Sequence, residues 1–302
     1  MLSRMRVNGL FLGFAIAGAL FGQASRTPKQ SDIDNHGHKL HVTIYAATGT
    51  APSPTIVFES GLGDSGTQCW NSVINLLPKS STAISYSRPG LGASEPDGEL
   101  PTPKHDAEIL HATLAQVAKP PYILVGHSWG GPRIRMYAAM YPDEVAGLVF
   151  VDPTDFTINA TDWQREIFGP MNDPQGLTQY DAIRKKLFSA PGITSTMRDE
   201  ADVAMTELRA GYAEIQALPM PARPLVVLLA QKEQPSPPGV TFPFDEKAFF
   251  RNLLIFRIKS LSAFARSVPE GTLVVTPDSS HYIQLSEPEL VVWAVERVMR
   301  KR

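Results

Sequence analysis

The sequence has little of several features that would assign a protein to a simple class. Its 302 residues include one cysteine, Cys69, so no internal disulfide can form and the core must be stabilised by packing. Basic residues are not in excess: 28 Lys and Arg stand against 30 Asp and Glu, a net charge of -2. This balance lacks the positive footprint of a nucleic-acid-binding protein, so we expect no nucleic-acid partner. No internal repeat or low-complexity tract is evident.

The chain also lacks a long apolar run of membrane-spanning length. Residues 7–21 are apolar apart from Asn8, but these roughly 15 residues fall short of the roughly 20 that span a bilayer. Arg4 and Arg6 precede the run, and Gly22-Gln23-Ala24 follows it. This pattern predicts a cleaved secretory signal peptide over residues 1–24. An uncleaved anchor helix is the alternative.

Cleavage would give an exported protein, periplasmic or secreted, that begins near Ser25 and has no stable membrane anchor. No cysteine follows the apolar run where a lipidated residue would stand. The 28 basic residues would lose Arg4 and Arg6, leaving 26 against 30 acidic residues and a net charge of -4.

Short apolar runs alternate with segments of helical periodicity along the rest of the chain. Strands are expected at 40–46, 55–59, 82–87, 122–125, 147–151, 225–230 and 272–276, and helices at 70–77, 104–118, 133–140 and 286–301. Residues 25–38 are polar and are expected to be frayed. Strands without polar alternation suit a sheet that is covered on both faces. The pattern predicts an α/β fold with a doubly wound, mostly parallel sheet.

One interval, residues 154–221, interrupts this alternation. It contains no clear strand, and residues 201, 204, 208, 212, 215 and 218 lie on one helical face. We interpret the interval as a helical cap inserted over the strand ends, with residues 25–153 and 222–302 forming the core. A pair of crossover helices with long loops is the alternative.

The motif Gly126-His127-Ser128-Trp129-Gly130-Gly131 stands between an apolar strand and a helix. A G-x-S-x-G turn in this context is typical of a nucleophile elbow, in which a sharp turn exposes the serine oxygen. Glycines at 126 and 130 leave room where backbones crowd. Ser128 is therefore the candidate nucleophile.

A serine hydroxyl needs a base to take its proton. Among seven histidines, His281 follows the strand at 272–276 and so lies at the same sheet edge as Ser128. His127 adjoins the serine, but its side chain should point away from that of Ser128. We interpret the histidines other than His281 as structural or solvated.

The acid that would orient His281 has two candidates. Asp152 ends the strand after the elbow helix, and Glu233 follows the strand at 225–230. Both satisfy the order serine, acid, histidine. Asp152 is favoured because it directly follows a buried strand, whereas Glu233 lies in a polar, proline-rich stretch and could be a solvated charge beside Lys232.

Acyl transfer also needs donors for a developing oxyanion. The backbone N–H of Trp129, the residue after the nucleophile, is one candidate. The backbone N–H of Leu62 is the other, because the loop after strand 55–59 lies at the same edge and its Gly61 and Gly63 allow a close approach.

Taken together, four ordered motifs resemble the α/β-hydrolase superfamily from about residue 38 to 301. They are Phe58-Glu59-Ser60-Gly61-Leu62-Gly63-Asp64, Ser87-Arg88-Pro89-Gly90-Leu91-Gly92-Ala93-Ser94, the elbow, and Ser279-Ser280-His281-Tyr282-Ile283. The resemblance implies the α/β-hydrolase fold, with Ser128 as nucleophile, His281 as base and Leu62 and Trp129 as oxyanion donors.

The sequence departs from the family pattern at three places. Glu59-Ser60 precedes the glycine where many relatives have His, Ser87 stands where the D-R-x-G-x-G-x-S loop has Asp, and residues 231–233 replace the usual acid. Some relatives, including one group of haloalkane dehalogenases, place the acid where Asp152 stands. Those dehalogenases and the epoxide hydrolases use an aspartate nucleophile, so Ser128 argues against both activities.

The expected function is that of an exported serine hydrolase that cleaves small to medium carboxylic esters with a Ser-His-Asp triad. No metal or organic cofactor is implied, the expected partner is a small-molecule ester, and the oligomeric state stays open. Alternatives are an amidase or proline-iminopeptidase-like peptidase, a lactonase or a cofactor-free perhydrolase. A hydrolase-fold ligand-binding protein is the non-enzymatic alternative, although it would not need the Ser/His pair and both donor loops.

Overall fold

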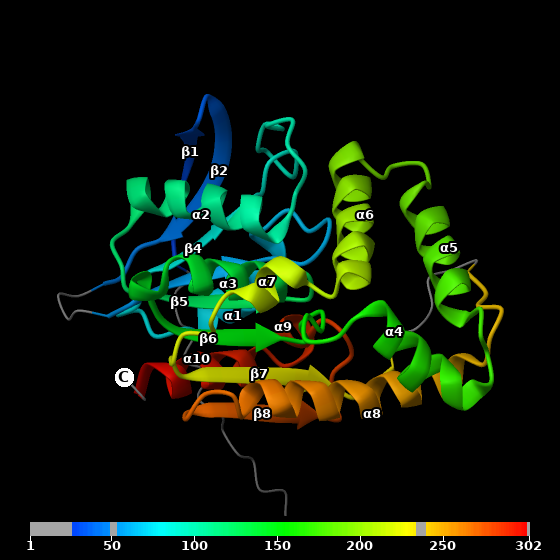
Figure 1. Ribbon diagram of the computed structural model, residues 1–302. Helices are drawn as coiled ribbons and strands as arrows, with labels where there is room; N and C mark the ends of the chain where they lie inside the picture. Colours follow the sequence, from blue (N-terminus) through cyan, green and yellow to red (C-terminus); the bar gives the residue numbers. More distant parts are fainter. Residues whose placement is uncertain (1–25, 49–52, 234–239, 301–302) are drawn as a thin grey trace, which may run out of the picture.

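An eight-stranded sheet forms the centre of the molecule in the computed structural model, which describes residues 26–48, 53–233 and 240–300 (Figure 1). The predicted signal peptide at 1–24 lies outside the described residues. The strands are β1 (Lys29–Asn35), β2 (His38–Tyr45), β3 (Thr55–Glu59), β4 (Ala83–Tyr86), β5 (Tyr122–His127), β6 (Val145–Val151), β7 (Leu225–Ala230) and β8 (Gly271–Thr276). Their order is β1-β2-β4-β3-β5-β6-β7-β8.

Only the pairs β1/β2 and β2/β4 are antiparallel among these strands, and the remaining pairs are parallel. The chain therefore forms the doubly wound, mostly parallel sheet that the alternation of strands and helices predicted.

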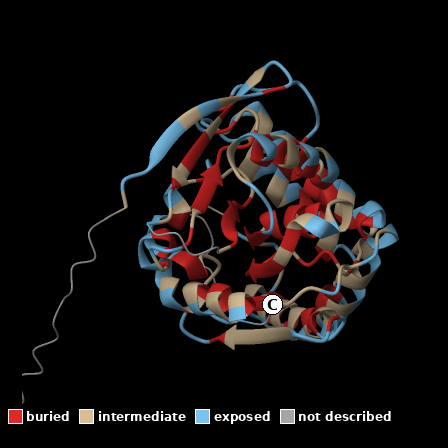
Figure 2. Ribbon diagram, turned by 90° about the vertical axis from the view of Figure 1, so that its left-hand side faces the viewer, coloured by how far each residue is buried: buried red, intermediate tan, exposed pale blue. Residues whose placement is uncertain are grey.

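Helices cover both faces of the sheet. One face packs on α2 (Pro103–Val117), α3 (Gly130–Met140) and α8 (Glu246–Ala265), and the other on α1 (Asn71–Leu76) and α10 (Pro288–Arg300). Because successive strand side chains point to opposite faces, Leu124 of β5 joins the first cluster while Ile123 and Val125 join the second. Figure 2 shows the buried strands enclosed by helices with exposed outer surfaces.

The interval 154–221 consists of helices and connections and contains no strand. Its helices are α4 (Ala160–Trp163), the π-helix η3 (Gln164–Phe168), the 3-10 helix η4 (Gly169–Met171), α5 (Gly176–Phe188), α6 (Ser195–Ala210) and α7 (Ala213–Ala217). Helices α4, α5 and α6 stand beyond the carboxyl ends of the central strands (Figure 1). We refer to residues 154–221 as the cap.

The prediction that residues 201–218 form one helical face is wrong in one respect, because two helices share these residues. Helix α6 ends at Ala210, because Gly211 (φ +66°) and Tyr212 (φ +52°) both take the left-handed conformation that stops a helix. Tyr212 is nevertheless buried, together with Leu208 and Ile215, so the apolar pattern marked the core correctly but not the helix end.

Strand β1 and helix α8 escaped prediction. Strand β1 occupies residues that were expected to be frayed. It is a polar edge strand, and the side-chain amide of Asn35 donates to Ile109 O and Thr113 Oγ1, each at 2.9 Å. Helix α8 has apolar residues around most of its circumference, because it packs on the sheet and also lines the cavity described below, so no single stripe identifies it.

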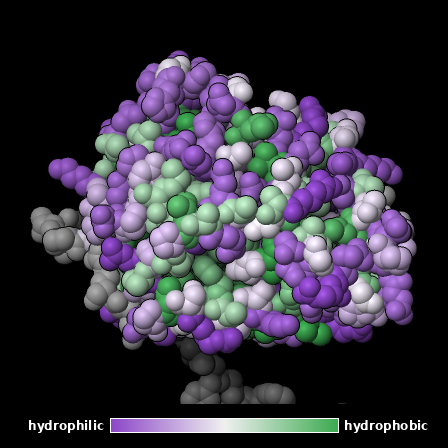
Figure 3. All heavy atoms as spheres, viewed as in Figure 1, coloured by the Kyte–Doolittle hydropathy of each residue, from purple (hydrophilic) through white to green (hydrophobic). Residues whose placement is uncertain are grey.

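The short remaining helices are η1 (Gln68–Trp70), η2 (Pro142–Glu144) and α9 (Ile283–Ser286). Polar residues cover much of the face seen in Figure 3, with apolar residues dispersed among them. Within the described part of the chain, every helix is too short or too polar to cross a bilayer.

Candidate active site

The turn that carries Ser128 is as sharp as the motif predicted. Ser128 has φ +52°, in the left-handed region that non-glycine residues rarely adopt. A Cβ added to Gly126 would lie 2.6 Å from Gly130 O, and one added to Gly130 would lie 2.5 Å from Glu59 O. Larger side chains at either glycine would therefore force the elbow and its neighbouring loop apart.

Backbone hydrogen bonds join this turn to the next strand. The Ser128 N–H donates to Val151 O at 3.1 Å, and the Thr154 N–H donates to Ser128 O at 2.9 Å. The segment that carries Asp152 is thus fixed against the segment that carries Ser128.

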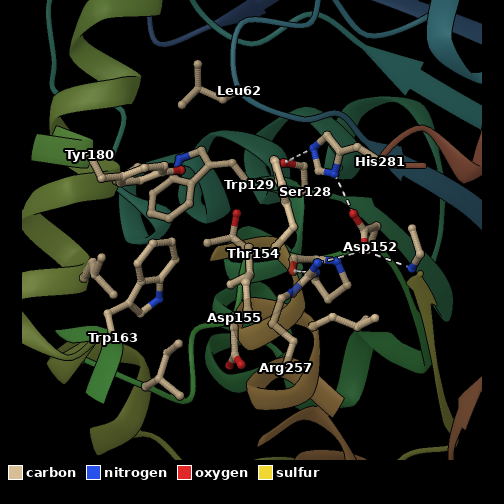
Figure 4. Close-up of a pocket in the computed structure, with 18 of the residues that line it drawn as sticks. Leu62, Ser128, Trp129, Asp152, Thr154, Asp155, Trp163, Tyr180, Arg257 and His281 are labelled. Atoms are coloured by element: carbon tan, nitrogen blue, oxygen red, sulfur yellow. Dashed lines mark hydrogen bonds and ion pairs between the residues drawn. The ribbon is translucent and has the colours of Figure 1, made fainter. Parts of the chain in front are cut away.

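His281 lies between Ser128 and Asp152 (Figure 4). Its Nε2 is 3.0 Å from Ser128 Oγ, and its Nδ1 is 2.6 Å from Asp152 Oδ2. The loop after β8 brings it there, and the Lys232 N–H holds that loop by donating to Ser279 O at 3.1 Å. The three side chains form a continuous chain of hydrogen bonds that can move a proton from the serine to the imidazole.

Asp152 is buried and has three partners. Oδ2 faces His281, while Oδ1 accepts from the Ala230 N–H at 3.1 Å and faces Nη1 of Arg257 at 3.1 Å. Burial acts to raise the pKa of Asp152, but Arg257, the bond to His281 and the Ala230 N–H together hold this pKa well below its ordinary value. The carboxylate is therefore charged and oriented toward His281.

The alternative acid, Glu233, takes a different position. It is exposed at the wall of the cavity and makes no hydrogen bond or ion pair with another described residue. The structure therefore brings Asp152, and not Glu233, to the Nδ1 atom of His281.

The two predicted oxyanion donors border the same cavity as Ser128 (Figure 4). The loop with Leu62 passes close over the nucleophile, since a Cβ added to Gly61 would lie 3.2 Å from Ser128 Cβ. Neither the Leu62 N–H nor the Trp129 N–H donates to a backbone oxygen within the described ranges. Both donors can therefore serve a negatively charged oxygen bound beside Ser128.

A cavity of about 330 Å³ opens above the three side chains. Cap residues Trp163 and Tyr180 lie across it from His281 (Figure 4). The cap and α8 contribute further apolar and aromatic lining residues: Ile158, Ala204, Met205, Leu208, Tyr212, Phe250, Leu253 and Leu254. Besides Ser128, Asp152 and His281, the polar lining residues are Thr154, Asp155, Arg184, Gln231, Lys232, Glu233 and Arg257.

His127 points away from Ser128 and packs against His281. The ring centroids of the two histidines are 4.6 Å apart, and His127 Nε2 lies 3.0 Å from the His281 carbonyl oxygen. Burial, assisted by His281, lowers the pKa of His127 to about 3. The neutral ring therefore donates to the His281 carbonyl oxygen and supports the loop that carries His281. This agrees with the prediction that His127 is structural.

Some residues at the site were not found from the sequence. Arg257 of α8 reaches Asp152, and its other terminal nitrogen donates to Pro153 O at 2.7 Å. Beneath the oxyanion loop, Glu59, Arg88 and Glu200 form buried ion pairs. Glu59 and Arg88 stood in two of the sequence motifs, but nothing in the sequence pointed to Glu200 or to the pairing of these three residues.

The described residues contain no group of three or more His, Cys, Asp or Glu side chains placed to hold a metal ion.

Comparison with known proteins places this geometry in a family. A family model described as the alpha/beta hydrolase family matches residues 56–295. Among curated proteins, the probable transporter efuK of Hormonema carpetanum is 25% identical over 309 residues, covering 91% of this chain and 44% of that protein. The chain thus spans less than half of that relative's length.

Two solved structures share the fold. The epoxide hydrolase CorEH, 18% identical, gives a TM-score of 0.59 over 91% of this chain and 99% of that chain. An esterase from Thermogutta terrifontis, 19% identical, gives a TM-score of 0.57 over 91% and 98%. Because the family model matches most of the chain, we conclude that this protein belongs to the alpha/beta hydrolase family.

Proposed function

We propose that this protein is a serine hydrolase that cleaves carboxylic esters through an acyl-enzyme. The observation that carries the proposal is the hydrogen-bonded chain from Ser128 Oγ through His281 to Asp152, which ends in a cavity bordered by two backbone N–H donors. Serine, and not the aspartate that opens an epoxide, stands at the nucleophile position.

In the first half of the reaction, His281 Nε2 takes the proton of Ser128 as Oγ attacks the ester carbonyl carbon. The carbonyl π electrons move to oxygen, and the Leu62 and Trp129 N–H groups stabilise the resulting oxyanion. When the oxyanion collapses, the bond to the alkoxy group breaks and His281 gives that group its proton. An alcohol leaves, and the acyl group stays on Ser128.

In the second half, His281 removes a proton from a water molecule that attacks the acyl-enzyme. The bond to Ser128 Oγ then breaks, Oγ recovers the proton from His281, and a carboxylic acid leaves. Asp152 stays ionised throughout and stabilises the imidazolium that forms in each half.

The cavity supports a limit on substrate size. Its volume of about 330 Å³ lies at the lower end of the roughly 300–1,000 Å³ common for ligand sites. Apolar and aromatic side chains, many of them from the cap and α8, form most of its wall. We propose small to medium esters with an apolar acyl or alcohol group as the substrates.

A fluorophosphonate probe tests the nucleophile, and a substrate panel tests the bond that is cleaved. We expect the probe to label the peptide that contains Ser128, identified by mass, and esters to be turned over faster than matched amides, lactones and epoxides. Absence of label, or faster cleavage of a prolyl amide than of every ester, would overturn the proposal.

We further propose that the protein is exported after cleavage near Ser25, on the basis of the N-terminal pattern. N-terminal sequencing of material recovered outside the cytoplasm should begin at or near that residue. Retention of Met1 would overturn cleavage.

A further inference from the structure

Glu200 joins the cap to the loop that carries an oxyanion donor. It lies on α6, has a completely buried side chain, and accepts the backbone N–H of Gly63 at 2.7 Å. Gly63 directly follows Leu62, so the peptide plane that Glu200 holds is the one next to the candidate donor. Glu200 stands 137 residues away along the chain.

Arg88 connects Glu200 to the rest of this loop. Its Nε and Nη2 donate to Glu200 at 2.7 and 3.2 Å, and its Nη1 donates to Glu59 at 2.9 Å. The remaining two N–H groups donate to Ser60 O at 2.9 Å and Gly61 O at 2.7 Å. All five guanidinium donors are used, and two of them clamp the carbonyls just before Leu62.

A second cation ties Glu200 to the nucleophile side. Arg133 of α3 donates to Glu200 Oε1 at 2.8 Å and also pairs with Asp106 of α2. Helix α3 begins directly after the elbow of Ser128. Glu200 therefore touches the oxyanion loop, the loop of Arg88 and the helix that follows the nucleophile.

The first turns of α6 also contact two glycine-rich loops closely. A Cβ added to Gly63 would lie 2.8 Å from Met197 Cε, and one added to Gly90 would lie 2.2 Å from Thr196 Oγ1. The helix therefore rests directly on the oxyanion loop and on the loop after Arg88. This packing is independent of the ion pairs.

The charge of Glu200 is stabilised by the two arginines beside it. Burial acts to raise the pKa of Glu200, but Arg88, Arg133 and the Gly63 N–H outweigh it and lower this pKa below its ordinary value. Glu200 is therefore ionised. Loss of the Glu200 charge would break its ion pairs with Arg88 and Arg133 and weaken the acceptor of the Gly63 N–H, which favours rearrangement of the loop that these groups hold.

We propose that Glu200 is a positioning residue of the oxyanion hole: through Gly63 and Arg88 it fixes the loop that directs the Leu62 N–H at the oxyanion. Seating of cap helix α6 thereby completes the catalytic site, in addition to forming part of the substrate cavity. The proposal rests on the proposed serine-hydrolase function. Oxyanion donors act because they are held in place before the reaction, and a shift of about 1 Å can cost on the order of 10²-fold in rate.

Two variants of Glu200 and one control test this role. Glu200→Gln keeps the size but loses the charge, and Glu200→Asp keeps the charge but withdraws the carboxylate from Gly63. The control is Asp181→Asn, because Asp181 is a buried cap carboxylate that pairs with Lys185 and Arg209 and is not bonded to the oxyanion loop.

With a short ester, we expect both Glu200 variants to lose about 10- to 100-fold in kcat while KM stays within about threefold of the unchanged protein. Fluorophosphonate labelling of Ser128 should slow in parallel. Asp181→Asn should keep kcat within about twofold. Equal kcat in the Glu200 variants and the control, or a rise in KM alone, would overturn the proposal, because Glu200 would then only shape the cap.

The unchanged protein separates this proposal from the one it rests on. If it neither hydrolyses esters nor is labelled at Ser128, the proposed function fails; if it does both and Glu200→Gln matches it, only the role of Glu200 fails. Should both variants misfold, amide hydrogen exchange of the unchanged protein decides. Slow exchange at Gly63 supports the proposal, and exchange as fast as in an exposed loop overturns it.

Discussion

The two sides of the candidate site are held in place by different forces. On the nucleophile side, Ser128 and Asp152 follow adjacent strands, and neutral backbone hydrogen bonds fix their segments to each other. On the oxyanion side, the loop of Leu62 is held by buried charged side chains, and one of these comes from the cap. Position on the nucleophile side thus follows from the sheet, whereas on the oxyanion side it follows from charge pairing between distant segments.

This difference predicts how each side of the site responds to substitution. A backbone ladder loses little when one side chain is truncated, so a change such as Ser128→Ala should remove chemistry and leave the fold intact. Breaking a buried ion pair from one end costs about 3–5 kcal/mol, because an uncompensated charge stays behind. Substitutions on the oxyanion side should therefore disturb geometry as well as rate.

The largest expected effect comes from the nucleophile itself. Ser128→Ala removes the attacking oxygen, and we expect kcat for ester hydrolysis to fall by about 10⁴–10⁶ with an unchanged melting temperature. Steady-state kinetics and thermal unfolding measure the two quantities. Retention of most of the activity would show that another group attacks the ester.

The acid should give the next largest loss. Asp152→Asn keeps the size of the side chain but removes the charge that stabilises the imidazolium, so kcat should fall by about 10³–10⁴. Glu233→Gln is the matched control and should cost less than about tenfold, because an exposed carboxylate with no partner among the described residues contributes little. If the two losses were reversed, Glu233 would be the acid.

Arg257 is the exception on the nucleophile side, since it is a charge from α8 placed against Asp152. Its cation is the main group that keeps the pKa of Asp152 low despite burial, so its loss should raise that pKa and weaken the charge that Asp152 presents to His281. In Arg257→Met we expect kcat to fall about tenfold and the acidic limb of the pH–activity profile to move to higher pH. Arg251→Met, an exposed change on the same helix, should leave the profile in place. A downward shift would contradict this role of Arg257.

The last prediction concerns stability and not rate. Because the folded-state pKa of His127, about 3, lies below its ordinary 6.5, only the unfolded state binds the proton between these values. Stability should therefore rise with pH in this window, with a slope of up to about 1.4 kcal/mol per pH unit from this group. Urea unfolding from pH 4.5 to 6.5 should show a shallower slope for His127→Gln, whereas the exposed His36→Asn should keep the original slope. Equal slopes would show that His127 is not held neutral.

Much of the nucleophile side could be predicted from the sequence because its signals are local. The elbow needs glycines within two residues of Ser128, and an apolar strand followed at once by Asp152 marks a side chain at the sheet edge. His281 was placed by the same reasoning about strand ends. The choice between Asp152 and Glu233 needed the structure, because both follow strands and only three-dimensional distance separates them.

The oxyanion side could be predicted only as far as the backbone. Gly61 and Gly63 indicated a loop that approaches closely, but nothing in the sequence around Glu200 distinguishes it from the neighbouring polar residues of α6. Its partners lie more than 60 residues away, and helical periodicity carries no information about such pairings. Arg257 was missed because its partner Asp152 is also distant in the sequence, and because helix α8, which carries it, had no clear apolar stripe.

The contact between Glu200 and the Gly63 N–H has a consequence for engineering and for divergence within the family. Caps are natural units to exchange between hydrolases, because they shape the substrate cavity. Here a transplanted cap would also have to place a carboxylate where Glu200 stands, within reach of the Gly63 N–H and of the two cations Arg88 and Arg133. On the proposed role of Glu200, substrate range and turnover would depend on the same segment, and an exchanged cap without that carboxylate should bind a new ester but process it slowly.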